Sequence, residues 1–412
     1  MNILYVVNDF FPMYYGGVER YVLNISKQMQ KSGHAVKVLT YGMDDRTRGY
    51  ASKGKILHKQ YTYENIPVIS VRHPDIPPDI GFRIGDDMIE HDLFGIIQQE
   101  NADVIHVAHP MKLNPVVNIA SELHIPSVLT LTDFWLLCPR GRFFKPDYSA
   151  CNSPMNGVKC IRECGIDSSV TERYKKAGEI FRKAAKIIAP SRFIIRVFEN
   201  NGWDKEIALV RHGFAHGCAR EAAKKRTREN GSVVFGYTGL ITKFKGLDLL
   251  VESFRNIRNR NISLYIYGDI YQEWVWERTF YEDLVQSAQG DSRVRFMGRY
   301  THNDLPEIFS TIDINVIPST TLESYGLVVT ESISYNVPVI VSDIVGSAYE
   351  YVSDGLNGFI FPVNSPGQLG QIMQRIADNP RLIDSLRDNI VLPPRIEEEA
   401  FMLEGIYKEL VR

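Results

Sequence analysis

Residues 318–343 read PSTTLESYGLVVTESISYNVPVIVSD, and this stretch decides the fold of the second half of the chain. A carboxylate, Glu323, precedes a turn that contains Gly326. A second carboxylate, Glu331, lies about two turns into the helix that the pattern predicts. The apolar run 337–341 then predicts a buried strand. A helix that begins after a glycine turn presents unpaired N–H groups and a positive dipole end, which together attract a phosphate.

Two interpretations of the two glutamates are open at this point. In the first, their side chains accept hydrogen bonds from hydroxyl groups on either side of the phosphate, which is the arrangement expected for a nucleotide-sugar donor. In the second, Glu323 and Glu331 are two solvated acids on an ordinary amphipathic helix. The rest of the chain has to decide between them.

Apolar runs alternate with amphipathic stretches along the chain, which is typical of βαβ units and parallel sheets. The predicted strands are 3–7, 35–40, 68–71, 104–107, 127–131, 186–189, 207–210, 233–237, 264–267, 294–297, 314–317, 337–341 and 359–361. The charged stretch 219–231 lacks apolar periodicity and predicts a linker, whereas 396–412 predicts a packed terminal helix. We therefore expect an α/β protein with two doubly wound, Rossmann-like domains, over 1–218 and 231–395. Ligands of such sheets bind beyond the carboxyl ends of the strands, so two facing domains would enclose a cleft.

The bulk composition excludes several classes of protein. The chain has 412 residues, of which 44% are hydrophobic and 23% charged, as in a globular protein that is soluble. The 47 basic and 49 acidic residues leave a net charge of −2, which gives no general reason to expect nucleic acid as a partner. No apolar run approaches the roughly 20 residues that span a bilayer, and residues 1–7 lack the features of a signal peptide. We expect a cytoplasmic protein.

Two more glycine-containing turns follow predicted strands. Gly16-Gly17 lies between the first strand and the first helix, where glycines let the backbone approach a ligand. The stretch 239–248, GLITKFKGLD, places Lys243 and Lys245 where a lysine can reach a pyrophosphate. Neither stretch has the GxGxxG pattern of dinucleotide binding, so a nicotinamide-dependent dehydrogenase is disfavoured. A tight turn and exposed loop lysines are the alternative interpretations.

Taken together, these motifs resemble the retaining glycosyltransferases of family 4, which have the GT-B fold. The resemblance covers nearly the whole chain. It rests on GG-x-E-R at 16–20, KG-x-D at 245–248, YGD at 267–269, FMG at 296–298, the two glutamates at 323 and 331, and DGLNG at 354–358. It implies an acceptor-binding domain followed by a nucleotide-sugar donor-binding domain, and a terminal helix that crosses back onto the first domain.

The resemblance also implies roles for individual residues. Glu323 corresponds to the family's glutamate near the donor sugar at the reaction centre, and Lys245 to the lysine that binds the diphosphate, so both are catalytic candidates. Glu331 corresponds to the glutamate that binds the ribose. The other donor-side candidates are Gly16, Gly17, Gly239, Lys243, Ser324, Tyr325, Gly326 and Leu327.

Two positions depart from the family pattern. Leu240 stands where the family usually has an arginine, which removes one cation from the diphosphate unless Lys243 or another basic residue replaces it. Thr132 stands where the family often has a histidine, and threonine cannot titrate. Thr132, Asp133 and His109 are the candidates for the acceptor side or the reaction centre.

The chemistry implied by the resemblance does not need that histidine. Retaining enzymes of this type are thought to react on one face, with the leaving diphosphate helping to deprotonate the acceptor hydroxyl. No Asp-x-Asp motif appears in the right context, so we expect no catalytic metal or other cofactor. The acceptor would be a glycan or a lipid-linked molecule in surface polysaccharide or glycolipid synthesis. A nucleotide-sugar epimerase of the same fold, or a degenerate nucleotide-sugar-binding protein, are the competing hypotheses.

Four of the five cysteines are clustered, at Cys138, Cys151, Cys160 and Cys164. A structural zinc ion with four thiolate ligands would stiffen this Pro-, Gly- and Asn-rich insertion. Unrelated reduced thiols, or a redox-labile pair, are the alternatives.

A peripheral membrane contact is also expected, at the inner face of the membrane. The stretch 173–186, RYKKAGEIFRKAAK, has six basic residues and one acid, and could lie on an anionic lipid surface. The aromatic-rich stretch 10–15, FFPMYY, adds to this expectation. A solvated helix face is the alternative.

Overall fold

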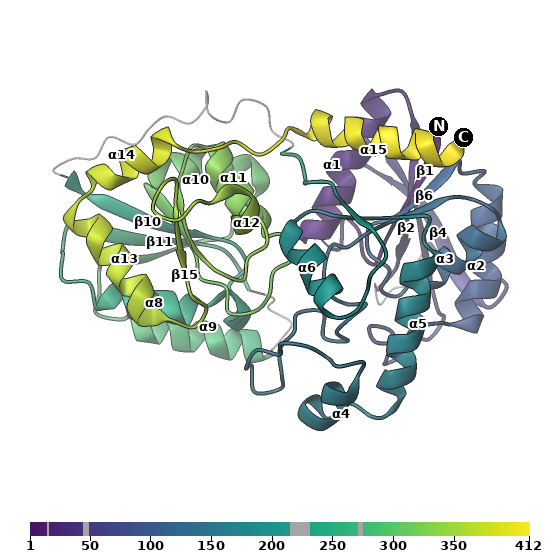
Figure 1. The fold of residues 1–412 in the computed structure, drawn as a ribbon, viewed down its shortest axis with the longest axis horizontal. Coiled ribbons are helices and arrows are strands. Elements are labelled where there is room, and N and C mark those ends of the chain that lie inside the picture. The colour runs from purple at the N-terminus through teal and green to yellow at the C-terminus, as the bar shows by residue number, and fades with distance from the viewer. Residues whose placement is uncertain (15, 44–48, 215–230, 271–274) are drawn as a thin grey trace. The chain divides into compact units, whose positions relative to one another are not determined.

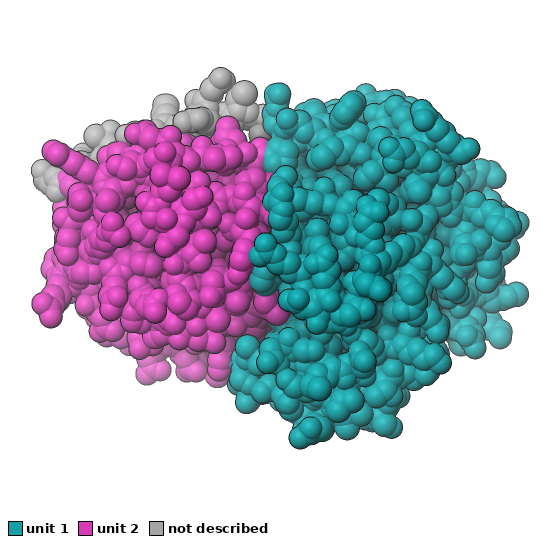
Figure 2. All heavy atoms as spheres, in the orientation of Figure 1, with its two compact units in different colours: residues 1–215, 394–412 teal, residues 216–393 magenta. Residues whose placement is uncertain are grey.

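The computed structural model describes residues 1–14, 16–43, 49–214, 231–270 and 275–412 (Figure 1). The chain divides into two compact units, coloured separately in Figure 2. Unit 1 comprises Met1–Ala215 and Pro394–Arg412, and unit 2 comprises His216–Pro393. The predicted linker, 219–231, lies outside the described residues except for its last residue.

Unit 1 is built on a mainly parallel sheet. Within the described residues its strands run in the order β3-β4-β5-β2-β1-β6-β7-β8-β9. Their bounds are β1 Asn2–Val7, β2 Ala35–Tyr41, β3 Ala51–Lys53, β4 Ile56–Tyr63, β5 Ile66–Arg72, β6 Val104–Val107, β7 Ser127–Thr130, β8 Lys186–Ala189 and β9 Ile207–Leu209. The helices are α1 Gly17–Lys31, α2 Asp87–Gln99, α3 Pro115–Glu122, α4 Val158–Cys164, α5 Ser169–Lys183, α6 Arg192–Asn200 and α15 Ile396–Val411.

All seven strands predicted for this half are present, but the sequence did not predict the edge pair β3 and β4. These two strands are antiparallel to their neighbours. Strand β4 reads ILHKQYTY, in which most side chains are polar and partly exposed. The apolar run that identifies a buried parallel strand is therefore missing there.

Unit 2 contains a parallel sheet with the order β12-β11-β10-β13-β14-β15 among the described residues. Its strands are β10 Val233–Thr238, β11 Ile262–Tyr267, β12 Val294–Gly298, β13 Ile314–Ile317, β14 Val339–Ser342 and β15 Phe359–Phe361. Its helices are η2 Lys243–Lys245, α8 Leu247–Arg255, α9 Val275–Ala288, η3 His302–Asp304, α10 Leu305–Thr311, α11 Leu327–Ser334, α12 Ala348–Tyr351, α13 Pro366–Asp378 and α14 Arg381–Asp388. All six predicted strands are present, and the strand order reverses on either side of β10, where doubly wound sheets bind ligands.

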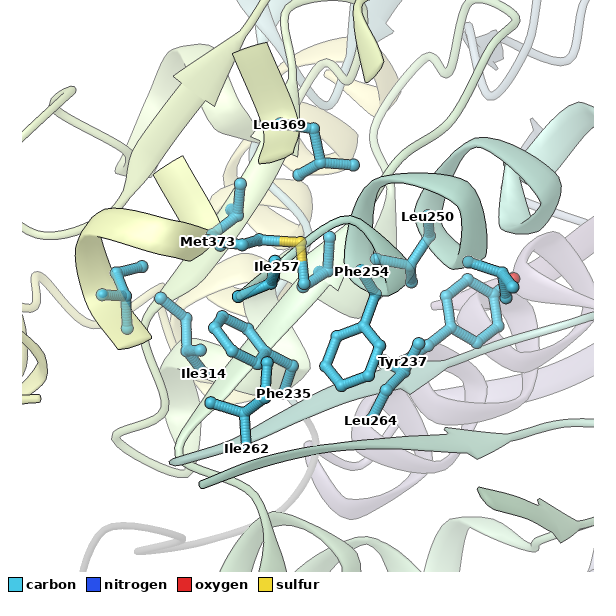
Figure 3. Packing of buried hydrophobic residues seen from close by; sticks show 14 of the residues in the cluster. Phe235, Tyr237, Leu250, Phe254, Ile257, Ile262, Leu264, Ile314, Leu369 and Met373 are labelled. Carbon is cyan, nitrogen blue, oxygen red and sulfur yellow. The ribbon is translucent and has the colours of Figure 1, made fainter. Parts of the chain in front are cut away.

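The core of unit 2 explains why these sequences form a helix-covered sheet. Figure 3 shows apolar side chains of α8 and α13 packed against the face of the sheet. The labelled residues are Phe235, Tyr237, Leu250, Phe254, Ile257, Ile262, Leu264, Ile314, Leu369 and Met373. Strands that are buried in this way need near-continuous apolar runs, which is the pattern seen in β10 and β13.

The last helix, α15, packs against α1 in unit 1, after the chain has passed through all of unit 2. Polar groups hold it there. The fully buried Glu399 carboxylate accepts from the Gly213 N–H at 2.6 Å and lies 3.0 Å from His212 Nδ1. Tyr407 is hydrogen-bonded to Tyr5 at 3.2 Å and to His106. Burial lowers the pKa of His106 to about 3, so this imidazole is neutral within the core.

The two segments that enter and leave unit 2 lie side by side within unit 1. Phe214 donates its N–H to the Pro394 carbonyl at 2.8 Å and accepts from the Ile396 N–H at 3.1 Å. A Cβ on Gly213 would lie 2.6 Å from both the Arg395 carbonyl oxygen and the Ile396 Cα. Only glycine lets the two backbones approach this closely.

We predict that Gly213→Ala destabilises unit 1 by about 1–3 kcal/mol, because the new methyl group meets backbone atoms that cannot rotate away. Gly405→Ala is the matched control. Gly405 lies in α15 with open space around its Cβ position, so alanine should stabilise the helix by up to about 1 kcal/mol. Urea unfolding measures both changes, and equal effects at the two positions would contradict the proposed close approach.

Candidate functional site

The donor-side residues of unit 2 are brought together by a close backbone contact. Gly246 has a φ of +69°, and a Cβ at this position would lie 2.0 Å from the Pro318 carbonyl oxygen. Thr320 donates its N–H to the Phe244 carbonyl at 2.9 Å. The turn after β10 therefore lies directly on the segment after β13, although about 70 residues separate them in sequence.

This contact places Lys245 beside Glu323. Lys245 Nζ donates to Glu323 Oε1 at 2.7 Å, and Ser319 Oγ donates to the same carboxylate oxygen. Both charged side chains are partly buried, which strengthens their attraction relative to a surface pair. The two catalytic candidates thus form one cluster with Ser319, a residue that the sequence analysis did not single out.

The turn that precedes α11 also needs glycine. Gly326 has a φ of +82°, and a Cβ there would lie 2.5 Å from the Val345 side chain. The backbone on either side is fixed, since Ser347 donates its N–H to the Tyr325 carbonyl at 2.6 Å and Glu323 donates its N–H to the Ile344 carbonyl at 3.0 Å. The Tyr325 side chain is buried in the core, so of that residue only the backbone is available to a ligand.

Glu331 lies on α11, just past its first turn, with Leu327 as the first residue of that helix. The side chain of Glu331 is mostly buried, and its Oε1 lies 3.7 Å from Nδ1 of His302. His302 opens η3, which Thr301 and Asp304 fix through a capping box. This histidine is not among the residues predicted from the sequence, because nothing in the local pattern at 300–304 indicates that it lies near α11.

The other donor-side candidates differ in exposure. Gly239 follows β10 with a φ of +145°, and its carbonyl lies 2.1 Å from the Cβ position of Gly268. Lys243 is exposed, and Leu240 is half-buried. Ser324 is half-buried next to Glu323.

In unit 1 the glycine turn covers a buried carboxylate. Gly16 is the N-cap of α1, and a Cβ there would lie 2.6 Å from Glu19 Oε2. Gly17 begins the helix and is exposed. Burial raises the pKa of Glu19 to about 6, and the nearby charge of Asp9 adds to this effect, whereas His109 and Lys112 oppose it.

A buried ion pair lies beside this carboxylate. Lys112 Nζ donates to both oxygens of Asp9, at 2.7 and 2.8 Å, and Asn8 donates to Asp9 at 2.7 Å. Lys112 has a φ of +66°, which is unfavourable for a residue with a Cβ. The fold therefore maintains a strained backbone and two desolvated charges at this position.

His109 and Asp133 form a second pair at the same edge of the sheet. His109 Nε2 lies 2.9 Å from Asp133 Oδ2, and Nδ1 accepts from the Met111 N–H at 3.1 Å. Burial disfavours the charged imidazole, but Asp133, with Glu19 and Asp9 behind it, outweighs burial and raises the pKa of His109. An imidazole is thus present next to Thr132, which donates to the Ala108 carbonyl at 2.7 Å.

Three buried residues of this cluster were not predicted from the sequence, namely Asp9, Glu19 and Lys112. Asp9 and Lys112 each follow a strand, β1 and β6, which are neighbours in the sheet. Their position at the carboxyl ends of adjacent parallel strands was the available signal. Glu19 lies within the GG-x-E-R motif itself.

The four clustered cysteines are neighbours and carry no disulfide. Burial raises the pKa of the Cys160 thiol to about 12, and the charges of Cys138, Cys164 and Cys151 contribute to this rise. No three His, Cys, Asp or Glu side chains within the described part of the chain are grouped so that they could hold a metal ion. The structural zinc ion remains a prediction.

The expected membrane elements differ in exposure. Phe10 and Phe11 are buried, with Phe11 stacked on Tyr63, so they are not exposed as expected. Met13 and Tyr14 are exposed, and Tyr15 lies outside the described residues. No helix of the described ranges is both long and apolar enough to cross a membrane.

Comparison with known families identifies the chain. The model of the family "Glycosyltransferase Family 4" matches residues 15–216, and that of "Glycosyl transferases group 1" matches residues 219–391. The chain belongs to glycosyltransferase family 4. The predicted family and the GT-B fold are both confirmed.

Curated relatives of this glycosyltransferase have several activities. An uncharacterised glycosyltransferase of Methanocaldococcus jannaschii is 23% identical over 92% of this chain and 90% of its own length. The glycogen synthase of Mycobacterium tuberculosis is 23% identical over 92% and 87%. The lipopolysaccharide 1,2-N-acetylglucosaminetransferase of Salmonella typhimurium is 27% identical, but the match spans 48% of this chain and 54% of that enzyme.

Solved structures share the fold at lower identity. Sucrose-phosphate synthase from Thermosynechococcus elongatus has a TM-score of 0.72 at 18% identity, covering 99% of this chain and 98% of that one. The Anabaena protein HepE, solved in complex with UDP, has a TM-score of 0.69 at 16% identity, covering 99% and 100%.

We predict that Glu19→Gln stabilises the glycosyltransferase at pH 7.5 by about 2 kcal/mol. The folded-state pKa of Glu19 is raised above the ordinary value of 4.5, so the native fold favours the neutral carboxyl. As the pH rises from 4.5 to 6, the free energy of unfolding falls, because the unfolded chain releases the Glu19 proton more readily than the native fold does. The loss persists at higher pH. Glutamine stays neutral and avoids it.

Urea unfolding at pH 7.5 and pH 4.5 measures this effect. The difference between variant and wild type should be large at pH 7.5 and small at pH 4.5. The exposed Glu179→Gln on α5 is the control and should change neither value. An equal gain at both pH values would show that ionisation of Glu19 is not its cause.

Proposed function

We propose that the enzyme transfers a sugar from a nucleoside-diphosphate sugar to an acceptor hydroxyl with retention of anomeric configuration and without a catalytic metal ion. The observation that carries this proposal is the Lys245–Glu323 pair, which lies immediately before the N-terminus of α11. A fixed cation and a helix N-terminus together favour a diphosphate.

The pair gives each residue a defined task. As the bond between sugar and diphosphate breaks, negative charge grows on the leaving diphosphate, and Lys245 together with the N–H groups of α11 stabilises it. Glu323, held by Ser319 and Lys245, then accepts hydrogen bonds from the donor-sugar hydroxyls and fixes the sugar's orientation. Glu331 would accept from the ribose hydroxyls.

The acceptor side is proposed for the cluster in unit 1. Both nitrogens of His109 are engaged, one by Asp133 and one by the Met111 N–H. His109 therefore orients Asp133 in this arrangement, and the half-exposed carboxylate of Asp133 is the group that can accept from an acceptor hydroxyl. The leaving diphosphate would take the acceptor proton, because Thr132, which stands where the family often has a histidine, cannot titrate.

The setting of the reaction is proposed from the relatives. One curated relative acts on lipopolysaccharide, and two are glycogen synthases. We place this enzyme in the cytoplasm, where it would extend a glycan or a lipid-linked acceptor in surface polysaccharide or glycolipid synthesis.

Nucleoside diphosphates test the donor site directly. UDP, GDP and ADP should be compared by thermal shift, and the nucleotide of the true donor should stabilise the fold by about 2.7 kcal/mol at a concentration 100 times its Kd. If none of them raises the melting temperature, unit 2 does not bind a nucleotide sugar.

We predict that Lys245→Met lowers kcat by about 10²–10³-fold, because the charge on the leaving diphosphate loses its cation. Lys243→Met removes the same charge from the other end of η2, where the side chain is exposed. This variant should have a much smaller effect on kcat. Equal losses in both variants would indicate that only the general positive potential of the turn is important.

Retention and metal independence are checked with the same enzyme. The anomeric configuration of the product, measured by NMR, should match that of the donor sugar. Treatment with EDTA should leave the rate of transfer unchanged. An inverted product, or activity that is lost with EDTA and restored by a divalent cation, would refute the respective part of the proposal.

A further inference from the structure

Helix α4 and the turn before it expose apolar side chains to solvent. Met155 is 56% exposed, Val158 45% and Ile161 38%. Val158 and Ile161 are three residues apart and therefore share one face of the helix. We call Met155, Val158 and Ile161 the α4 tip. Cys160, on the same helix, is buried and faces the protein.

The α4 tip is held in place by the fold. Met155 and Asn156 have φ values of 48° and 55°, which are unfavourable for residues with a Cβ. Ser153 accepts from the Met155 N–H at 3.2 Å and donates to Asn201 at 2.8 Å, which fixes the turn to the end of α6. The anchored turn, with its two unfavourable φ values, keeps the Met155 side chain exposed to water. Strained residues of this kind concentrate at functional sites.

The segment that carries this apolar group is rich in basic residues. Residues 140–186 contain eleven basic and five acidic side chains, a net charge of +6, whereas the whole chain has −2, which leaves −8 on the remainder. Helix α5, which packs against α4, exposes Lys175, Lys176, Arg182 and Lys183. In Figure 1 α4 lies beyond one end of α5, outside the layers that cover the sheet of unit 1.

We propose that the α4 tip and the exposed lysines of α5 dock onto an anionic lipid surface. The three apolar side chains would enter the boundary between headgroups and acyl chains, and Lys175 and Lys176 would contact the headgroups. The charge pattern favours lipid over a protein partner, and so does the size of the patch. Three side chains fall far short of the roughly 800 Å² per partner that a stable protein interface buries.

This proposal concerns where the proposed reaction takes place and does not depend on the donor chemistry. The nucleotide-induced thermal shift tests donor binding and involves no lipid. A failure of one proposal is therefore distinguishable from a failure of the other.

Vesicle co-sedimentation of the full chain tests the docking surface. The protein should bind vesicles of phosphatidylcholine and phosphatidylglycerol in equal parts, bind pure phosphatidylcholine vesicles weakly, and dissociate at high salt. Val158→Ser combined with Ile161→Ser should lower the partition coefficient by about tenfold or more. Phe401→Ser is the matched control, because Phe401 is 76% exposed on α15 of the same unit and should not affect binding.

Charge and folding are tested in parallel. Lys175→Gln with Lys176→Gln should weaken binding to anionic vesicles and reduce its dependence on salt. All variants should keep the wild-type melting temperature and the nucleotide-induced shift. Unchanged vesicle binding by the Val158/Ile161 variant would overturn the proposal. So would a wild-type dimer, detected by ultracentrifugation, that this variant abolishes, because the tip would then be a protein interface.

Discussion

The contact between Gly246 and the Pro318 carbonyl is the constraint on which the donor half of the molecule depends. It fixes the turn after β10 against the segment after β13, on either side of the point where the strand order reverses. Without it, Lys245 would no longer be fixed beside the Glu323 carboxylate. The cation and the carboxylate are thus positioned by the backbone, which is stiffer than any chain of side-chain contacts.

Unit 1 obtains its polar site differently, by burying charge. Asp9, Lys112 and Glu19 are buried at the ends of β1 and β6 and at the start of α1, where taking charged groups out of water costs free energy. Burial is the main cause of the raised pKa of Glu19, and the nearby charge of Asp9 adds to it. Buried charged groups that lower the stability of the protein are common at functional sites, because activity requires groups that a stable core would exclude.

The sequence predicted the parallel strands of both sheets because buried parallel strands need apolar runs, whereas the antiparallel edge strands β3 and β4 lack such runs. It indicated Glu323, Lys245 and Glu331 as candidates because they match short motifs. It did not predict the pairing of Asp9 with Lys112. These residues are 103 positions apart, and they meet only because β1 and β6 are neighbours. His302 was missed for the same reason, since its proximity to Glu331 depends on how η3 lies beside α11. Local patterns identify elements, whereas contacts between distant elements require the strand order.

The return of α15 to unit 1 has a consequence for the order in which the protein can fold during synthesis. Glu399 and Tyr407 satisfy polar groups of unit 1 on residues as early as Tyr5, yet they are translated after all of unit 2. While unit 2 is being translated, the surface of unit 1 that α15 covers in the native state is exposed, with its apolar and polar groups. Unit 2, in contrast, has its whole core available as soon as it emerges from the ribosome. The later half of the molecule can thus reach its native state before the earlier half, and unit 1 is the part that needs protection from aggregation in the interval.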